Sequence, residues 1–414
     1  MIKKINLALF LLFSIVTIAQ QSTSSPYSFY GIGDVRFKGT AENRLMAGVS
    51  VFPDSIHINI QNPAAYASLK MTTYTVGGSF NSTRLNSFTS NEKAQRSTLD
   101  YLAVGIPLKK MGFGFGLIPY SAVGYRINNK DALGVVNRYS ATGGLNKVFL
   151  GFGYKINPNI SVGADINYNF GKIETVGIEK IPEVQLGTQE VNTSELSGAN
   201  VNLSVMYQRK INQKLDAYGS FVFSPESNLS SKNTRVNSTV LYSDFFDPQN
   251  VDVADAIKNN NTIKLPSKAT FGFGVGQSKK WMVGAELTFQ QSSRFGNRNN
   301  DITNVEYKNA AKFGLGGYYI PNYSSFSNYF KKITYRGGFR YENTGMVIKN
   351  ENIRDYALTA GLGLPLGGAF SNLNIGVEYG RRGTAKALLI EENYTNVIMS
   401  LSLNDRWFIK RKYD

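Results

Sequence analysis

Few side chains in this sequence have the type and spacing that catalysis or metal binding requires. The chain has no cysteine and a single histidine, His57. The lack of cysteine excludes disulfides, thiolate metal sites and thiol nucleophiles, and one imidazole does not make a paired-histidine site. Acidic pairs such as Asp252 and Asp255, or Glu391 and Glu392, are better explained as solvated loop charges than as cation ligands. We therefore expect no enzyme activity, no cofactor and no metal.

Two glycine-rich motifs could be mistaken for nucleotide-binding loops. They are Gly112-Phe113-Gly114-Phe115-Gly116 and Gly272-Phe273-Gly274-Val275-Gly276. A phosphate-binding loop is followed by a helix whose N-terminus receives the phosphate, whereas these glycines alternate with apolar residues inside expected strands. Glycine in a strand often permits a close approach of other backbone. We predict that both motifs leave space beside the strand or accommodate atoms of another segment.

The first nineteen residues have the pattern of a secretory signal peptide. A basic start ending at Lys4 precedes the apolar run 5–18 and the small residue Ala19, after which cleavage is expected. The run is shorter than the roughly 20 apolar residues of a transmembrane helix. The exported chain is therefore expected to be soluble or to cross a membrane without helices.

The chain beyond about residue 72 shows the two-residue alternation that is typical of half-buried strands. For example, Ile166, Tyr168 and Phe170 alternate with Asn167 and Asn169. Fourteen such segments are expected, at 72–82, 97–108, 111–126, 146–156, 160–172, 199–211, 215–225, 268–277, 281–292, 310–320, 333–343, 355–365, 371–381 and 395–408.

The connections between these segments favour a barrel. Short turns alternate with long polar loops at 173–198, 226–267 and 293–309, and the longest loop is expected to hold at most a short helix near 251–257. Tight turns at one rim, long loops at the other and an even strand number are typical of a transmembrane β-barrel, whereas a β-sandwich need not sort its loops in this way. We predict an all-β, 14-stranded antiparallel transmembrane β-barrel with a polar lumen.

Lysines gather at the short turns of this expected barrel. Among them are Lys109, Lys110, Lys279, Lys280, Lys331 and Lys332, and they contribute to a formal net charge of +16. Short turns of such barrels face the periplasm, and each basic residue near an anionic membrane contributes about 1 kcal/mol of attraction. This basic rim either contacts lipid headgroups or an acidic periplasmic partner, or is simply a solvated surface. Nucleic acid is not an expected partner, because no recognition module is visible.

The tripeptide Asn62-Pro63-Ala64 lies directly before the first of the fourteen expected strands. In this motif, its position and the strand number, the chain resembles the long-chain fatty-acid transporter (FadL) family of fourteen-stranded outer-membrane barrels. The resemblance implies that residues 20–71 fold into the lumen as a plug, or hatch, and that residues 72–414 form the barrel in the cell outer membrane. Near the C-terminus, Trp407 and Phe408 resemble the aromatic closing strand that the barrel-assembly machinery uses for insertion.

The expected lumen is more charged than the apolar ligand pockets of that family. The inward-facing candidates are Asp165, Glu286, Arg336, Arg340, Glu342 and Glu378. Because Arg336, Arg340 and Glu342 lie two or four residues apart on one face of a strand, we predict a lumenal salt-bridge network that holds the hatch.

The resemblance implies two functions. The first is passive transport of hydrophobic small molecules through a hatch-gated lumen with a lateral exit, for which Pro119 and Gly124 would supply a kink in the third strand. The second is an accessory or scaffold subunit of a multiprotein outer-membrane machine, in outer-membrane protein assembly or type 9 secretion. Expected partners are outer-membrane lipids and, in the second case, a stable complex with other outer-membrane or periplasmic proteins.

Overall fold

In the computed structural model, alternate residues of each strand face opposite environments. Strand β6 (Ile160–Lys180) is representative. Its side chains Ile166 and Tyr168 are 64% and 53% exposed, whereas Asn167 and Asn169 are 0% exposed. A water-soluble sheet would bury the apolar side chains instead. The outer face is therefore apolar and the inner face polar, as in a membrane β-barrel.

The structure describes residues 23–88, 90–131, 133–242, 248–298, 304–325, 327–367 and 371–406. The helices are η1 (Pro26–Phe29), α2 (Ala41–Arg44), η2 (Pro63–Ser68), η3 (Ser292–Arg294), η4 (Tyr329–Lys332) and η5 (Lys386–Leu388), of which those marked η are 3-10 helices. None of the helices in these ranges is long and apolar enough to cross a membrane. The other strands are β1 (Asp34–Val35), β2 (Thr72–Asn86), β3 (Asn91–Leu108), β4 (Met111–Lys130), β5 (Val136–Lys155), β7 (Leu186–Lys210), β8 (Asp216–Ser224), β9 (Ser227–Leu241), β10 (Gln249–Val253), β11 (Ile257–Leu265), β12 (Lys268–Gln277), β13 (Trp281–Gln290), β14 (Val305–Tyr307), β15 (Ala310–Tyr319), β16 (Thr334–Ile348), β17 (Glu351–Pro365), β18 (Asn372–Gly383) and β19 (Glu391–Asp405).

Strands β2 to β19 form the wall of a closed antiparallel barrel. In three places, strands that follow each other in the chain lie end to end and form one strand of the wall. Strands β8 and β9 lie along β7, strands β11 and β12 lie along β9 and β8, and strands β14 and β15 lie along β16. Strand β10 pairs with the last residues of β9 and therefore continues the wall strand that contains β11. The wall therefore has fourteen strands, and the pairing of β19 with β2 closes it. This confirms the predicted fold class.

The strands extend beyond the expected segments, so two of the predicted long loops are wrong. Strands β6 and β7 cover most of 173–198, and β9, β10 and β11 cover most of 226–267, including the place of the expected short helix. The prediction failed because the outward side chains of these extensions, such as Glu195, Ser230 and Lys232, are polar, so the apolar outer face that marks the other strands is lost. Their backbone hydrogen bonds nevertheless continue from strand to strand.

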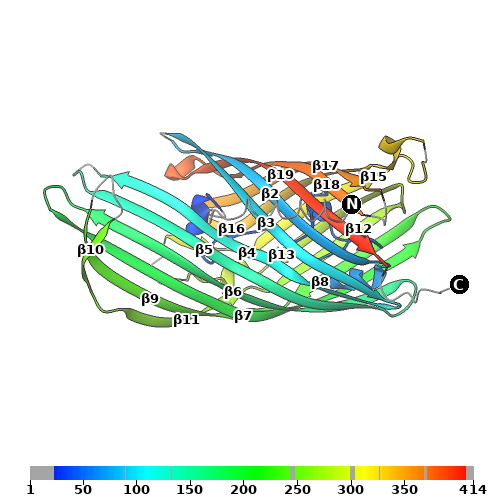
Figure 1. The fold of residues 1–414 in the computed structure, drawn as a ribbon, viewed down its shortest axis with the longest axis horizontal. Coiled ribbons are helices and arrows are strands. Elements are labelled where there is room, and N and C mark those ends of the chain that lie inside the picture. Colours follow the sequence, from blue (N-terminus) through cyan, green and yellow to red (C-terminus); the bar gives the residue numbers. More distant parts are fainter. Residues whose placement is uncertain are drawn as a thin grey trace, which may run out of the picture.

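The N-terminal segment, defined as residues 23–71, lies inside this wall (Figure 1, blue). Helix η2 contacts β3 to β7, and α2 contacts β18 and β19. Large side chains of the segment are buried there, among them Leu45, Val51 and Tyr66, each 0% exposed. The first wall strand, β2, begins at Thr72.

Candidate functional site

The tripeptide Asn62-Pro63-Ala64 begins helix η2 and attaches it to the wall. The Oδ1 atom of Asn62 accepts a hydrogen bond from the Ala64 N–H at 3.2 Å, and Pro63 occupies the start of the helix, where its missing N–H has no cost. The same Ala64 N–H also donates to Ser204 Oγ on β7, at 2.8 Å. The motif is thus both a helix cap and a contact point with the barrel.

Glycines of the wall accommodate the N-terminal segment. A Cβ atom at Gly112 would lie 1.9 Å from the backbone oxygen of Tyr66, and one at Gly274 would lie 2.5 Å from the ring of Phe52. These positions belong to the two glycine-rich motifs of the sequence, and the structure confirms that they admit atoms of another segment. No side chain larger than hydrogen fits at Gly112 unless the segment moves.

Replacing Gly112 by alanine should therefore destabilise the protein. We expect a loss of about 1–3 kcal/mol in the free energy of unfolding, because the new methyl group forces the backbone at Tyr66 to shift. Thermal unfolding of the purified protein measures the effect. The matched control is Gly337→Ala, where the nearest atom to the new Cβ is 3.6 Å away, and an equal loss in both variants would contradict the interpretation.

Arg44, the last residue of α2, forms two buried ion pairs with the wall. Its Nε donates to Glu378 Oε2 at 2.8 Å, and its Nη1 donates to Asp100 Oδ2 at 3.1 Å. All three side chains are at most 16% exposed. The carboxylates come from β18 and β3, so one guanidinium joins the N-terminal segment to two parts of the barrel.

Arg340 of β16 extends this network along the wall. Its Nη2 lies 3.1 Å from Glu378 Oε1 and 3.0 Å from Asp355 Oδ2. The Tyr394 hydroxyl donates to Asp355 Oδ1 at 2.7 Å. Glu378 is therefore shared between Arg44 and Arg340, and most charges in this cluster have a direct partner of opposite sign.

A second attachment lies around Asp34 of β1. Arg382 of β18 donates to Asp34 Oδ1 at 2.5 Å. Burial raises the pKa of Asp34, but Arg382 and Arg36 lower it by more, so the pKa lies below its ordinary value and the group is ionised. Nearby, the hydroxyl of Ser25 donates to Glu392 Oε1 at 2.5 Å.

The structure distributes the six predicted lumenal residues over different contacts. Arg340 and Glu378 form an ion pair, as described above. Glu286 accepts hydrogen bonds from the backbone N–H and hydroxyl of Ser50, both at 2.8 Å, and Arg336 donates to Asn374 at 2.8 Å. Asp165 accepts hydrogen bonds from the wall residues Asn167 and Asn202, and Glu342 lines a cavity described below.

Sequence reasoning missed several residues of this site. They are Asp34, Arg44, Asp100, Asp355, Arg382 and Tyr394. Asp100 and Asp355 do occupy inward positions of alternating strands, and that signal could have identified them. Arg44 had no comparable signal, because it lies in a segment without periodicity.

His57 lies between two carboxylates of the N-terminal segment. Its Nδ1 is 2.8 Å from Asp54 Oδ2, and its Nε2 is 3.6 Å from Glu42 Oε1. Burial lowers the pKa of His57, but Asp54 and then Glu42 raise it by more, against a weaker opposing effect of Arg336, so the pKa lies above its ordinary value. The contact explains the single histidine as a structural residue.

This contact predicts a pH dependence of stability. Because the pKa of His57 is raised in the folded state, its stabilisation is complete below the unfolded value of about 6.5 and is lost as the pH rises through the folded value. We expect the melting temperature to fall over that interval in the wild type and to fall less in His57→Gln. Parallel pH profiles of the two proteins would contradict this.

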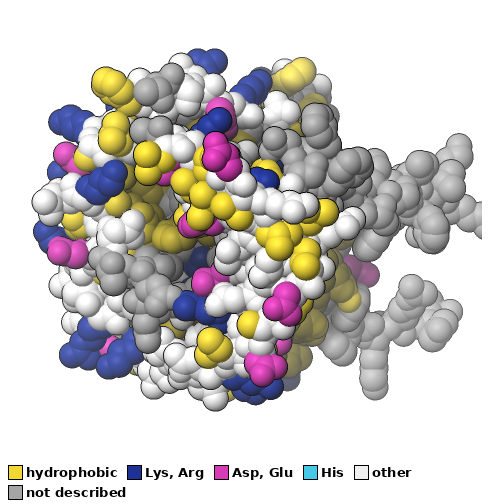
Figure 2. Space-filling model, turned by 90° about the vertical axis from the view of Figure 1, so that its left-hand side faces the viewer, with side chains coloured by type: hydrophobic (Ala, Val, Ile, Leu, Met, Phe, Trp, Pro, Cys, Tyr) yellow, Lys and Arg dark blue, Asp and Glu magenta, His cyan; other side chains and the backbone are white. Residues whose placement is uncertain are grey.

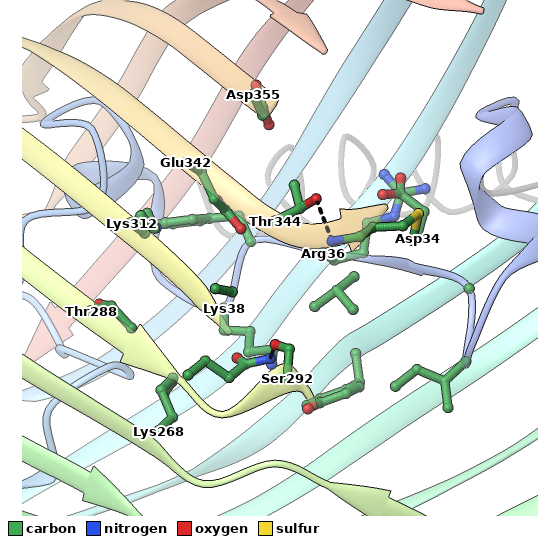
Figure 3. A pocket seen from close by; sticks show the side chains of 18 of the residues that line it. Asp34, Arg36, Lys38, Lys268, Thr288, Ser292, Lys312, Glu342, Thr344 and Asp355 are labelled. Carbon is green, nitrogen blue, oxygen red and sulfur yellow. Dashed lines mark hydrogen bonds between the residues drawn. The ribbon is translucent and has the colours of Figure 1, made fainter. Parts of the chain in front are cut away.

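A charged cavity of about 410 Å³ lies beside the N-terminal segment (Figure 3). Nine basic and six acidic side chains line it, together with serines, threonines and asparagines. The basic residues are Arg36, Lys38, Arg44, Arg96, Lys147, Lys268, Lys312, Arg340 and Arg382. The acidic residues are Asp34, Glu286, Glu342, Asp355, Glu378 and Glu392. Such a lining suits a polar, anionic or hydrated occupant better than a hydrophobic one.

The wall is interrupted by a seam between β3 and β4. Within the described residues, their pairing ends at Leu102 and Leu117, and beyond this point β3 pairs with β2 and β4 pairs with β5. Of the two residues expected to bend this strand, Pro119 lies at a bulge in the β4–β5 pairing, whereas Gly124 pairs in regular register with Thr142. The short strand β1 of the N-terminal segment pairs with β4 at residues 121–122. It covers part of the exposed strand edge.

The six lysines of the predicted basic rim lie on three connections at the same end of the barrel. Lys109 and Lys110 connect β3 to β4, Lys279 and Lys280 connect β12 to β13, and Lys331 and Lys332 end η4, between β15 and β16. The opposite end displays side chains of both charge signs (Figure 2). The predicted insertion residues Trp407 and Phe408, and the expected signal peptide 1–19, lie outside the described residues.

Comparison with known proteins identifies both a family and a fold. A family model described as BamG matches residues 1–414. No curated protein sequence matches the chain significantly.

Solved structures similar to this one include proteins described as channels and transporters. They include the CymD monoaromatic hydrocarbon channel, with 11% identity, a TM-score of 0.56 and coverage of 92% of this chain and 99% of that one. A FadL homologue of Pseudomonas aeruginosa has 12% identity, a TM-score of 0.60 and coverage of 89% and 98%. The toluene transporter TodX of P. putida has 14% identity, a TM-score of 0.60 and coverage of 90% and 100%. These similarities confirm the predicted FadL-like barrel fold.

Proposed function

The chain belongs to the BamG family, and we propose that it is a non-catalytic accessory subunit of a multiprotein outer-membrane machine that assembles or secretes proteins. On this proposal residues 20–71 act as a plug, and the barrel contributes its wall, loops and rim to the machine rather than a conducting lumen.

One observation carries this proposal: the lumen is occupied by a segment that buried charges attach to the wall. Arg44 of the segment pairs with Glu378 and Asp100 of the wall, and Asp34 of the segment pairs with Arg382 of the wall. A hydrophobic ligand in the remaining cavity would displace water from charged groups without replacing their hydrogen bonds, which is unfavourable. The geometry therefore favours a structural lumen.

The outer surfaces offer two kinds of contact for partners. The wall exposes apolar side chains such as Leu150, Ile166, Phe273 and Leu358, each at least 60% exposed, which suit lipid or a neighbouring membrane protein. The basic rim suits an acidic periplasmic protein or anionic headgroups. We propose the rim as a site for a periplasmic partner of the machine.

Native purification tests this function. We expect a tagged chain, extracted from its own outer membrane in mild detergent, to co-purify with large protein partners in fixed ratio. Charge reversal of the rim in Lys279→Glu/Lys280→Glu should remove a periplasmic partner while barrel heat-modifiability on gels is unchanged. A monomer without protein partners would contradict the proposal.

A second candidate function is passive transport of hydrophobic small molecules. The seam between β3 and β4 favours it, because an interrupted wall offers a lateral path from the barrel interior to the membrane. The similar solved structures include proteins named as hydrocarbon channels and toluene transporters. Uptake of a monoaromatic hydrocarbon into vesicles that contain the purified chain tests this candidate, and uptake equal to that of protein-free vesicles would contradict it.

A further inference from the structure

Four lysines line the lumenal cavity without a direct acidic partner. They are Lys38 of the N-terminal segment, Lys147 of β5, Lys268 of β12 and Lys312 of β15. Across the part of the chain that the structure describes, no carboxylate oxygen lies within 4.0 Å of these ammonium nitrogens. The arginines of the same cavity that pair with acids, such as Arg44 and Arg340, are distinct from this group.

Electrostatic repulsion connects the four lysines through Lys38. Lys38 interacts electrostatically with Lys147, Lys268 and Lys312. Figure 3 shows Lys38 between Lys312 and Lys268, with each lysine coming from a different segment. Burial lowers the pKa of Lys38 to about 8, and the charge of Lys312 adds to this effect against the opposing charge of Glu342. Lys147 is the most enclosed of the four, at 6% exposed.

Neighbouring groups compensate these charges only in part. The ring of Tyr120 lies 3.8 Å from Lys38 Nζ, measured to the ring centroid, which is a cation–π contact. Of the nearby acids, Glu342 is the main opposing charge for Lys38 and Lys312 but forms no ion pair with them in the described residues. Glu286 already accepts two hydrogen bonds from Ser50, and Asp165 accepts hydrogen bonds from two asparagines. Buried ammonium groups without a hydrogen-bonded counter-charge are unfavourable, so the cluster is arranged to receive an anion.

We propose that these four lysines form a lumenal binding site for a phosphate-bearing ligand. Ammonium groups form strong charge-assisted hydrogen bonds with phosphate oxygens. The cavity volume of about 410 Å³ lies within the range of about 300–1,000 Å³ that small-molecule sites occupy. A phosphorylated lipid headgroup and a free phosphate compound present the same chemistry. The inference does not depend on the proposed function, because either a scaffold or a channel can hold such a ligand.

Calorimetric titration of the delipidated, detergent-purified chain with pyrophosphate at constant ionic strength tests the site. We expect binding to the wild type and at least about tenfold weaker binding to Lys268→Gln/Lys312→Gln, since each lost ammonium removes charge-assisted hydrogen bonds. The matched control is Lys93→Gln/Lys130→Gln, which removes two exposed lysines outside the cavity and outside the basic rim and should bind as the wild type does. Absence of binding to the wild type, or an equal loss in both double variants, would overturn the proposal.

Two further measurements keep the test decisive. The lumenal variant should melt no lower than the wild type without ligand, because it removes repulsion between like charges; should it fail to fold, Lys38→Gln replaces it in the titration. Phosphorus analysis of the freshly purified chain identifies the source of the ligand. Phosphorus in an organic extract supports a lipid headgroup, and phosphorus in an aqueous extract supports a free phosphate compound.

Discussion

Replacing Arg44 by methionine is expected to lower the free energy of unfolding by about 3–5 kcal/mol, the usual cost of removing one partner from a buried ion pair. The substitution leaves Asp100 without its guanidinium and leaves Glu378 with Arg340 alone. Methionine keeps much of the side-chain volume, so the loss reflects charge rather than packing. Thermal unfolding gives the size of the effect, and limited proteolysis of the N-terminal segment shows whether it has been released.

The control for this prediction is an exposed ion pair of the same chemistry. Arg381 contacts Glu391, but its side chain is 48% exposed, so Arg381→Met should cost no more than about 1 kcal/mol. In the double variant Arg44→Met/Glu378→Gln the two losses should not add, because the groups share one contact. Equal losses in the two arginine variants would show that the buried lumenal ion pairs stabilise the protein no more than the exposed one does.

Much of the fold could be predicted because lipid imposes a simple rule on each strand. Residues such as Ile166 and Asn167 must face opposite environments, and this alternation marked all fourteen wall strands. The prediction of strand ends failed in β7 and β9, because outward side chains such as Glu195 and Lys232 are polar there and the apolar outer face is lost. The sequence pattern therefore predicts which segments form strands better than it predicts how long the strands are.

The candidate site was less accessible to sequence reasoning, because its contacts join distant parts of the chain. Arg44 and Glu378 are 334 positions apart, and no local pattern relates them. Glu378 was expected to face the lumen from its strand position alone, whereas the lysine cluster around Lys38 was not expected at all. It arises only when β5, β12 and β15 are brought together around the N-terminal segment.

Deleting residues 23–71 while retaining the preceding residues is expected to turn the barrel into an open pore. The wall closes through β19 and β2 without help from the segment, and its inner face is polar enough to hold water. Since barrels of sixteen to eighteen strands leave an aqueous channel and eight-stranded ones are filled by side chains, a fourteen-stranded wall without its filling should conduct small solutes. Liposome swelling should increase by about tenfold or more over the wild type.

The deletion also separates the two functional proposals. If the segment closes the lumen of a scaffold, solute flux rises in the deletion variant while protein partners bound at the rim or the outer wall are retained, because those surfaces contain no part of residues 23–71. If the segment instead gates a lateral path at the seam, the deletion removes β1 from the β4 edge and should abolish hydrocarbon selectivity together with gating.

Heat-modifiability on gels shows that the variant barrel is folded. Unchanged swelling in a folded variant would mean that the segment fills the lumen without closing it, since the cavity beside it would then already conduct.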